Sequence, residues 1–203
     1  MSGRYQEKED SMKYDVILAG VGGQGVLSVA AIIARAAAEE KLEVRQSEVH
    51  GMAQRGGAVL AHLRISDRAI ASDLVPQGSA DLIISMEPLE GLRYAAWLSQ
   101  EPAGVLVSAA DPVTNIPDYP DLSGILDTIK NFPLYRIVEA AALAKEAGLA
   151  RSINMVMVGA ASAFLPINAA VLEDTIRKIF GHKDSAVIDA NIKAFNLGRK
   201  AAK

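Results

Sequence analysis

The sequence predicts an α/β fold in which a mostly parallel sheet is flanked by helices and followed by a helical C-terminal part. The first indication is an apolar, β-branched run at residues 16–19, followed by four glycines and then by an Ala-rich, amphipathic stretch at residues 26–40. Short apolar runs then alternate with helical patterns as far as residue 147, and only helical patterns follow residue 154. Strand, glycine turn and helix form the first half of a βαβ unit, so we expect the sheet to be built around this opening.

The other elements follow from local signals along the chain. Strands are expected where short apolar or alternating runs occur, at residues 44–49, 58–65, 81–86, 105–108 and 134–138. Helices are expected at residues 88–98 with Pro88 in the first turn, at 125–131, at 139–147 before Gly148, at 155–164, after the cap Asn168 as far as 180, and at 185–199. We expect residues 109–121 to be a surface loop, residues 1–12 a disordered tail and residues 13–203 a single domain.

Composition excludes several classes of function. The 203 residues carry a net charge of −3 with no concentrated basic patch, which argues against a nucleic-acid or anionic-membrane surface. No apolar run approaches the roughly 20 residues of a membrane span, and the polar N-terminus does not resemble a secretory signal. We therefore expect a cytoplasmic protein. Because the chain has no cysteine, it offers no disulfide, no thiolate nucleophile and no cysteine-ligated iron–sulfur cluster.

The glycine turn matches the dinucleotide fingerprint GxGxxG through Gly20, Gly22 and Gly25. Glu48 lies near the end of the second expected strand, where a ribose-binding carboxylate would stand. However, another strand follows instead of a crossover helix, so the plan of a Rossmann dinucleotide fold is not completed. A tight turn that needs glycine for packing is the alternative. A stand-alone NAD- or flavin-dependent oxidoreductase that uses this turn therefore stays an alternative function for the chain.

A second segment, residues 48–57, combines an acid, an imidazole, an amide and a guanidinium with three glycines. Glycine lets the backbone approach a partner closely, and an arginine beside it can bind a carboxylate or a phosphate with its fork. We interpret this segment as a substrate or partner site formed by Glu48, His50, Gln54, Arg55, Gly56 and Gly57.

Other polar residues are expected to have structural roles. A metal site at His50 and His62 is not favoured, and the alternation of its strand places His62 on the solvated face. Glu87 is expected to complement the dipole of the helix that follows it, and Asn154 to cap or anchor a helix.

Four stretches together resemble one family, the gamma domain of 2-oxoacid:ferredoxin oxidoreductases, and within it the beta subunits of indolepyruvate ferredoxin oxidoreductases. The stretches are GVGGQGV at residues 20–26, SEVHGMAQRGG at 47–57, ADLIISMEPLEGLR at 80–93 and NIKAFNLG at 191–198. The resemblance covers nearly the whole chain from Lys13, and the HGMAQRGG form points to the indolepyruvate branch.

The resemblance implies a cofactor-free accessory subunit that is inactive alone. A large partner subunit would carry thiamine diphosphate, magnesium and 4Fe-4S clusters, and would oxidise an aryl 2-oxoacid with coenzyme A while reducing ferredoxin. The turn would then meet cofactor, substrate or partner through Gly20, Gly22, Gly23, Gln24 and Gly25. Without its partner, the chain is expected to self-associate through the exposed apolar interface.

Overall fold

In the computed structural model, which describes residues 11–50, 56–114 and 116–203, the described residues form a mixed sheet of six strands. Its order is β2-β3-β1-β4-β5-β6, and the strands are β1 (Lys13–Val21), β2 (Glu43–His50), β3 (Ala58–Ser66), β4 (Leu82–Ser85), β5 (Val105–Ala109) and β6 (Tyr135–Val138). Strands β1, β4, β5 and β6 are parallel, whereas β3 is antiparallel to both of its neighbours. The predicted α/β fold class is confirmed. Residues 1–10 of the expected tail lie outside the described residues.

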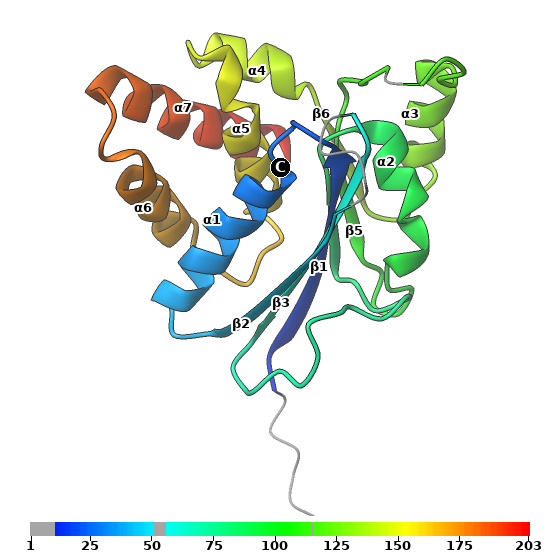
Figure 1. Ribbon diagram of the computed structural model, residues 1–203, viewed down its shortest axis with the longest axis horizontal. Helices are drawn as coiled ribbons and strands as arrows, with labels where there is room; N and C mark the ends of the chain where they lie inside the picture. The colour runs from blue at the N-terminus through cyan, green and yellow to red at the C-terminus, as the bar shows by residue number, and fades with distance from the viewer. Residues whose placement is uncertain (1–10, 51–55, 115) are drawn as a thin grey trace, which may run out of the picture.

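Helices cover both faces of the sheet (Figure 1). One face carries α1 (Val26–Glu39), α4 (Ala140–Glu146), α5 (Ile153–Ala161), α6 (Ala169–Phe180) and α7 (Ser185–Ala201), and the other carries α2 (Pro88–Arg93) and α3 (Leu122–Lys130). The helix expected at 88–98 is shorter, because after Arg93 the chain forms a 3-10 turn, Ala95–Trp97, and pairs with Ala80. Among the described residues, none of the helices has both the length and the apolarity needed to cross a bilayer.

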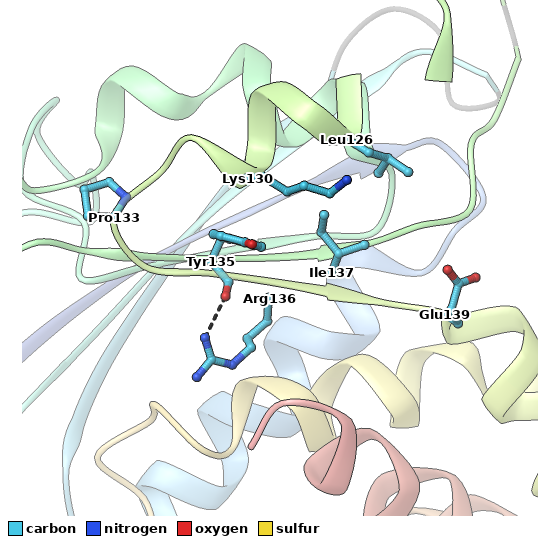
Figure 2. A pocket seen from close by; sticks show the side chains of 7 residues that line it. All are labelled: Leu126, Lys130, Pro133, Tyr135, Arg136, Ile137 and Glu139. Carbon is cyan, nitrogen blue, oxygen red and sulfur yellow. Dashed lines mark hydrogen bonds between the residues drawn. The ribbon is translucent and has the colours of Figure 1, made fainter. Parts of the chain in front are cut away.

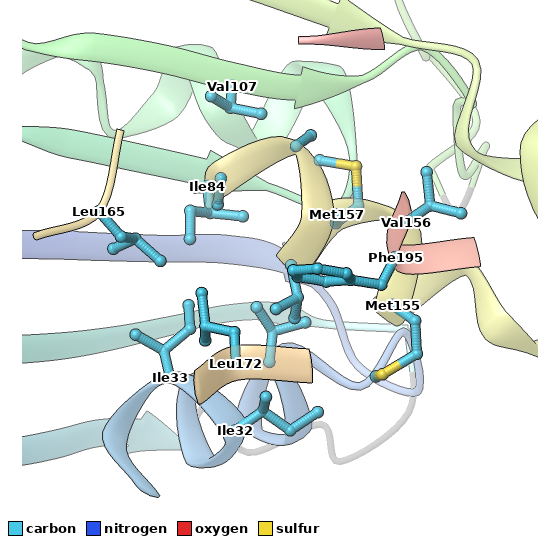
Figure 3. Packing of buried hydrophobic residues seen from close by; sticks show 14 of the residues in the cluster. Ile32, Ile33, Ile84, Val107, Met155, Val156, Met157, Leu165, Leu172 and Phe195 are labelled. Atoms are coloured by element: carbon cyan, nitrogen blue, oxygen red, sulfur yellow. The ribbon is translucent and has the colours of Figure 1, made fainter. Parts of the chain in front are cut away.

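The core on the larger helical face is built around α5, whose residues 155–161 are all buried (Figure 3). Helix α7 crosses α5 at backbone contact. A Cβ atom on Gly159 would overlap the carbonyl oxygen of Phe195, and one on Gly198 would overlap that of Val156. The nearly uncharged stretch is buried as predicted over residues 155–162, but the helix ends at Ala161 and Ala163 is exposed. The glycine of NIKAFNLG serves this helix crossing.

The expectation for His62 is wrong, because its side chain is only 4% exposed. The segment between β3 and β4 folds back over this face of the sheet, and His62 Nδ1 accepts a hydrogen bond from the Val75 backbone at 3.2 Å. Beside it, Arg64 makes a two-bond contact with the buried Asp15 carboxylate. Burial and, to a smaller degree, the charge of Arg64 lower the pKa of His62.

Candidate functional site

The glycine turn and the second glycine segment meet at the carboxyl end of β1. Gly22 N–H donates to the Gly57 carbonyl at 2.8 Å, and Gly56 N–H donates to the Gly22 carbonyl at 3.4 Å. These two bonds continue the β1–β3 pairing beyond the strands. The two sequence motifs therefore form one structure, although the bonded glycines lie more than 30 positions apart in the chain.

Gln24 closes this structure from the inside. Its Oε1 accepts from Val21 N–H at 2.7 Å, and its Nε2 donates to the Met86 carbonyl at 2.9 Å. The amide thus ties the end of β1 to the end of β4. Gly20 leaves room for it, since a Cβ there would lie 3.0 Å from Gln24 Oε1 and 2.8 Å from Val26 Cγ2. Gly20 and Gln24 therefore shape the turn from within.

The last glycines of the turn differ from each other. Gly25 is the N-cap of α1 with φ of 77°, and a Cβ on it would overlap the amide of Asn154. That amide also donates from Nδ2 to the Gly25 carbonyl at 3.4 Å, so Asn154 acts as an anchor. Gly23 has φ of 101°, and a Cβ on it would meet no described atom within 4 Å, so its surface is open.

The position of Glu48 does not favour dinucleotide binding. Strand β3 lies between β1 and β2, so β2 is two strands away from the glycine turn, roughly 10 Å at the usual strand spacing. Glu48 also accepts a hydrogen bond from Gln46 Nε2 at 2.8 Å. His50 pairs through its backbone with Val59, while Gln54 and Arg55 lie outside the described residues.

A cavity of about 580 Å³, here called the switch-point cavity, opens at the carboxyl ends of β1, β4 and β5. The helix after β1 covers one face of the sheet and the helix after β4 covers the other (Figure 1). Such a reversal is where open α/β sheets bind ligands. The cavity is lined by Gly23, Gln24 and Gly25 of the turn and, among other residues, by Val113, Arg151 and Asn154.

Sequence reasoning missed the main role of Glu87, a carboxylate that is only 1% exposed. As expected, it caps α2, accepting from Glu90 N–H at 2.8 Å. It also accepts from Val113 N–H at 3.3 Å and from the Tyr119 hydroxyl, both on the loop between β5 and α3. Burial, followed by the hydrogen bond to this carboxylate, raises the pKa of Tyr119. Glu87 therefore fixes the loop that forms one wall of the switch-point cavity.

Of the two charged side chains that line the switch-point cavity, one has a hydrogen-bond partner among the described residues and the other does not. Asp111 accepts from Ala141 N–H at 2.9 Å and so caps α4. By contrast, the Arg151 guanidinium has no hydrogen-bond or ion-pair partner within the described part of the chain. The cavity is thus suited to an anionic group near the N-terminus of α1. Across the described residues, no group of three or more His, Asp or Glu side chains is arranged to hold a metal ion.

Another cavity, of about 600 Å³, lies beside the edge strand β6 (Figure 2). Its cations are already engaged. Lys130 pairs with Asp127 at 2.8 Å, and Arg136 donates to the carbonyls of Tyr135 and Ala202, each at 2.7 Å. None of the residues that the sequence singled out lines this cavity, so it is the weaker candidate for a site.

The chain is similar to known proteins over almost its full length. Residues 15–201 match the family described as pyruvate ferredoxin/flavodoxin oxidoreductase. The chain is 35% identical over 198 residues to indolepyruvate oxidoreductase subunit IorB of Archaeoglobus fulgidus, covering 94% of this chain and 96% of that one. It is 28% identical over 195 residues to 2-oxoglutarate synthase subunit KorC of Methanothermobacter marburgensis, covering 93% and 96%.

Solved structures show the same fold. A gamma subunit of a keto/oxoacid ferredoxin oxidoreductase from Geobacter sulfurreducens matches with a TM-score of 0.68 at 26% identity, over 93% of this chain and 98% of that chain. The 2-oxoglutarate:ferredoxin oxidoreductase of Magnetococcus marinus matches in fold with a TM-score of 0.74 at 24% identity, over 94% of this chain but 31% of that chain. The chain therefore belongs to the pyruvate ferredoxin/flavodoxin oxidoreductase family.

Proposed function

We propose that this chain is the accessory subunit of an indolepyruvate-type 2-oxoacid:ferredoxin oxidoreductase. In the reaction, an aryl 2-oxo carboxylate and coenzyme A give an acyl-coenzyme A, carbon dioxide and one proton, while two oxidised ferredoxins each take up one electron. The observation that carries the proposal is the 35% identity, over almost its full length, to a subunit named for indolepyruvate. Identity to the 2-oxoglutarate synthase subunit is lower, at 28%.

The redox cofactors of such an enzyme do not fit this chain. Iron–sulfur clusters need thiolate ligands, and the sequence has no cysteine. The sequence also lacks the GDG-plus-Asn motif by which thiamine enzymes hold magnesium diphosphate. The proposal therefore assigns thiamine diphosphate, magnesium and the 4Fe-4S clusters to a large partner subunit. This chain would be inactive without it.

The contribution of this chain is a surface for the assembled active site. Gly23 lines the switch-point cavity, and its neighbour Gly22 is bonded through the backbone to Gly56 and Gly57. At Gly23 a partner or an anionic ligand can approach the backbone closely. We assign Glu48, His50, Gln54 and Arg55 to the same surface as contacts for substrate, coenzyme A or partner. The support is that Gly56 and Gly57, at the end of the same sequence segment, are bonded to the glycine turn.

Reconstitution tests the proposal. The chain is purified alone and together with a thiamine- and cluster-bearing subunit from the same genome, and coenzyme A-dependent ferredoxin reduction is followed with indolepyruvate, pyruvate and 2-oxoglutarate. We expect activity only in the complex, with the highest kcat/KM for indolepyruvate. Turnover by the chain alone, or a preference for 2-oxoglutarate, would contradict the proposal.

A further inference from the structure

A second cavity opens next to the switch-point cavity, between helices α1, α5, α6 and α7. It measures about 590 Å³ and shares Arg151 and Asn154 with its neighbour. We call it the four-helix cavity. Its walls are largely apolar, with Ile32 and Met155 buried at its inner side and Phe180 half-buried near its opening. Such walls favour an apolar or aromatic group.

The charge around the four-helix cavity is of one sign. Arg151 and Lys183 line it, and neither side chain has an ion-pair or hydrogen-bond partner among the residues described. No described acidic residue lines the cavity. Three other cations on these helices are ion-paired: Arg35 with Glu39, Arg177 with Glu173, and Lys178 with Glu39 and Asp174. An unpaired positive edge on a chain of net charge −3 favours an anionic ligand.

A buried amide in the four-helix cavity can fix the orientation of a ligand. Asn191 lines it and is only 3% exposed. Its Nδ2 donates to the Val187 carbonyl at 2.8 Å, which leaves Oδ1 as an acceptor to which no described residue donates. A polar atom in such a place gains from a donor on the ligand. The cavity therefore combines apolar walls, an inner acceptor and two cations.

We propose that the four-helix cavity binds a small aryl carboxylate whose ring carries an N–H donor. The ring lies against Ile32, Met155 and Phe180, the ring N–H donates to Asn191 Oδ1, and the carboxylate faces Arg151 and Lys183. An adenine nucleotide fits less well, because no described carboxylate is present to bind ribose hydroxyls. The choice of an aromatic acid rests on the proposed function, since the relatives are named for indolepyruvate. The inference adds a site for that chemical class on this chain itself.

Calorimetric titration of the purified full chain tests the ligand class. We expect saturable 1:1 binding of indole-3-pyruvate or indole-3-acetate. Comparing the two titrations shows whether the cavity prefers the 2-oxoacid or the shorter acid that lacks the oxo group. Methylating the ring nitrogen of indole-3-acetate should weaken binding about fivefold, the usual cost of one lost hydrogen bond. Tryptamine, which has the ring but a positive charge, should not bind. Tighter binding of AMP than of both indole acids would overturn the proposal.

Variants locate the binding. The double change R151Q/K183Q should weaken indole-acid binding about tenfold through loss of two charge contacts. Ala31→Phe, at an exposed lining position of α1, should abolish binding by filling the cavity. Arg35→Gln, on the same helix but outside the cavity, is the matched control and should bind like the native chain. Equal thermal unfolding of the variants shows that they are folded. Undiminished binding in both cavity variants, or absence of saturable binding to the native chain, would refute the site.

The site and the proposed function can fail separately. Saturable binding that the cavity variants remove supports the site, even where the reconstituted complex prefers another oxoacid. Conversely, a complex that oxidises indolepyruvate while the purified chain binds neither indole acid upholds the proposed function and rejects the site.

Discussion

The α5–α7 crossing and the glycine turn both depend on glycine, but for different reasons. At the crossing, Gly159 and Gly198 have ordinary helical conformations and are needed because each faces a carbonyl oxygen of the other helix. At the turn, Gly23 and Gly25 have positive φ, and only Gly25 is also in close contact. The crossing is therefore a requirement of packing, whereas the turn combines backbone conformation with an open rim. A motif match alone does not separate these two uses.

The largest expected effect is at the crossing. Gly159→Ala should lower the free energy of unfolding by about 3 kcal/mol, the upper range for overpacking, because the clash is with backbone rather than with a side chain that can move. Gly124→Ala in α3 is the matched control, since nothing lies within 4 Å of its Cβ position, and it should stabilise by about 0.5–1 kcal/mol. Urea unfolding measures both. Equal stability of the two variants would mean that α5 and α7 do not cross at backbone contact.

Alanine substitutions at two glycines of the turn, Gly25 and Gly23, separate the effect of backbone conformation from that of side-chain contact. Gly25→Ala should cost about 2–3 kcal/mol, since it combines a positive φ with a clash against Asn154. Gly23→Ala carries only the conformational part, about 1–2 kcal/mol. The difference between their unfolding free energies isolates the contact with Asn154. It should fall in the double variants that also carry Asn154→Ala, and a difference that persists there would contradict the role of Asn154.

A smaller effect is expected from Tyr119→Phe. Loss of its hydrogen bond to Glu87 should lower stability by about 1 kcal/mol and speed hydrogen exchange at the Val113 amide, because the loop wall is then held by fewer contacts. Tyr94→Phe is the control, since the Tyr94 hydroxyl has no hydrogen-bond partner in the described residues. Unchanged exchange at Val113 in Tyr119→Phe would show that the hydroxyl does not hold the loop.

The smallest effect concerns pH. The pKa of His62 is lowered in the folded chain, so the unfolded chain binds a proton first as the pH falls below about 6.5. The free energy of unfolding therefore does not depend on His62 protonation above that pH, and it declines as the pH falls below it. His62→Asn, whose Oδ1 can take the place of Nδ1 and accept from Val75, should flatten the decline between about pH 6.5 and 5 in thermal unfolding scans. An identical pH profile in the variant would assign the decline to other groups.

The sequence predicted the helices and strands well because each carries a local signal, such as the β-branched run before the glycines or the Asn168 cap. It did not show that β3 inserts between β1 and β2, since strand pairing is decided by contacts far apart in the chain. The same limit explains the burial of His62, which a returning loop covers.

The site was predicted in part. The turn and the Gly56–Gly57 pair were both found as motifs, but only the folded structure joins them by backbone bonds. The partners of Glu87 lie 26 and 32 residues further along the chain, in a loop with no periodic pattern that could predict its docking. The expected contacts at Gln54 and Arg55 stay predictions.

The internal bonding of Gln24 has a kinetic consequence. Both ends of its amide are bound within the chain, and nearby Gly22 is bonded to Gly56 and Gly57, which lead into β3. This part of the turn is therefore already ordered before any other subunit arrives. Association then incurs little loss of conformational entropy at this part of the turn, which favours a slow dissociation rate over a fast but loose encounter.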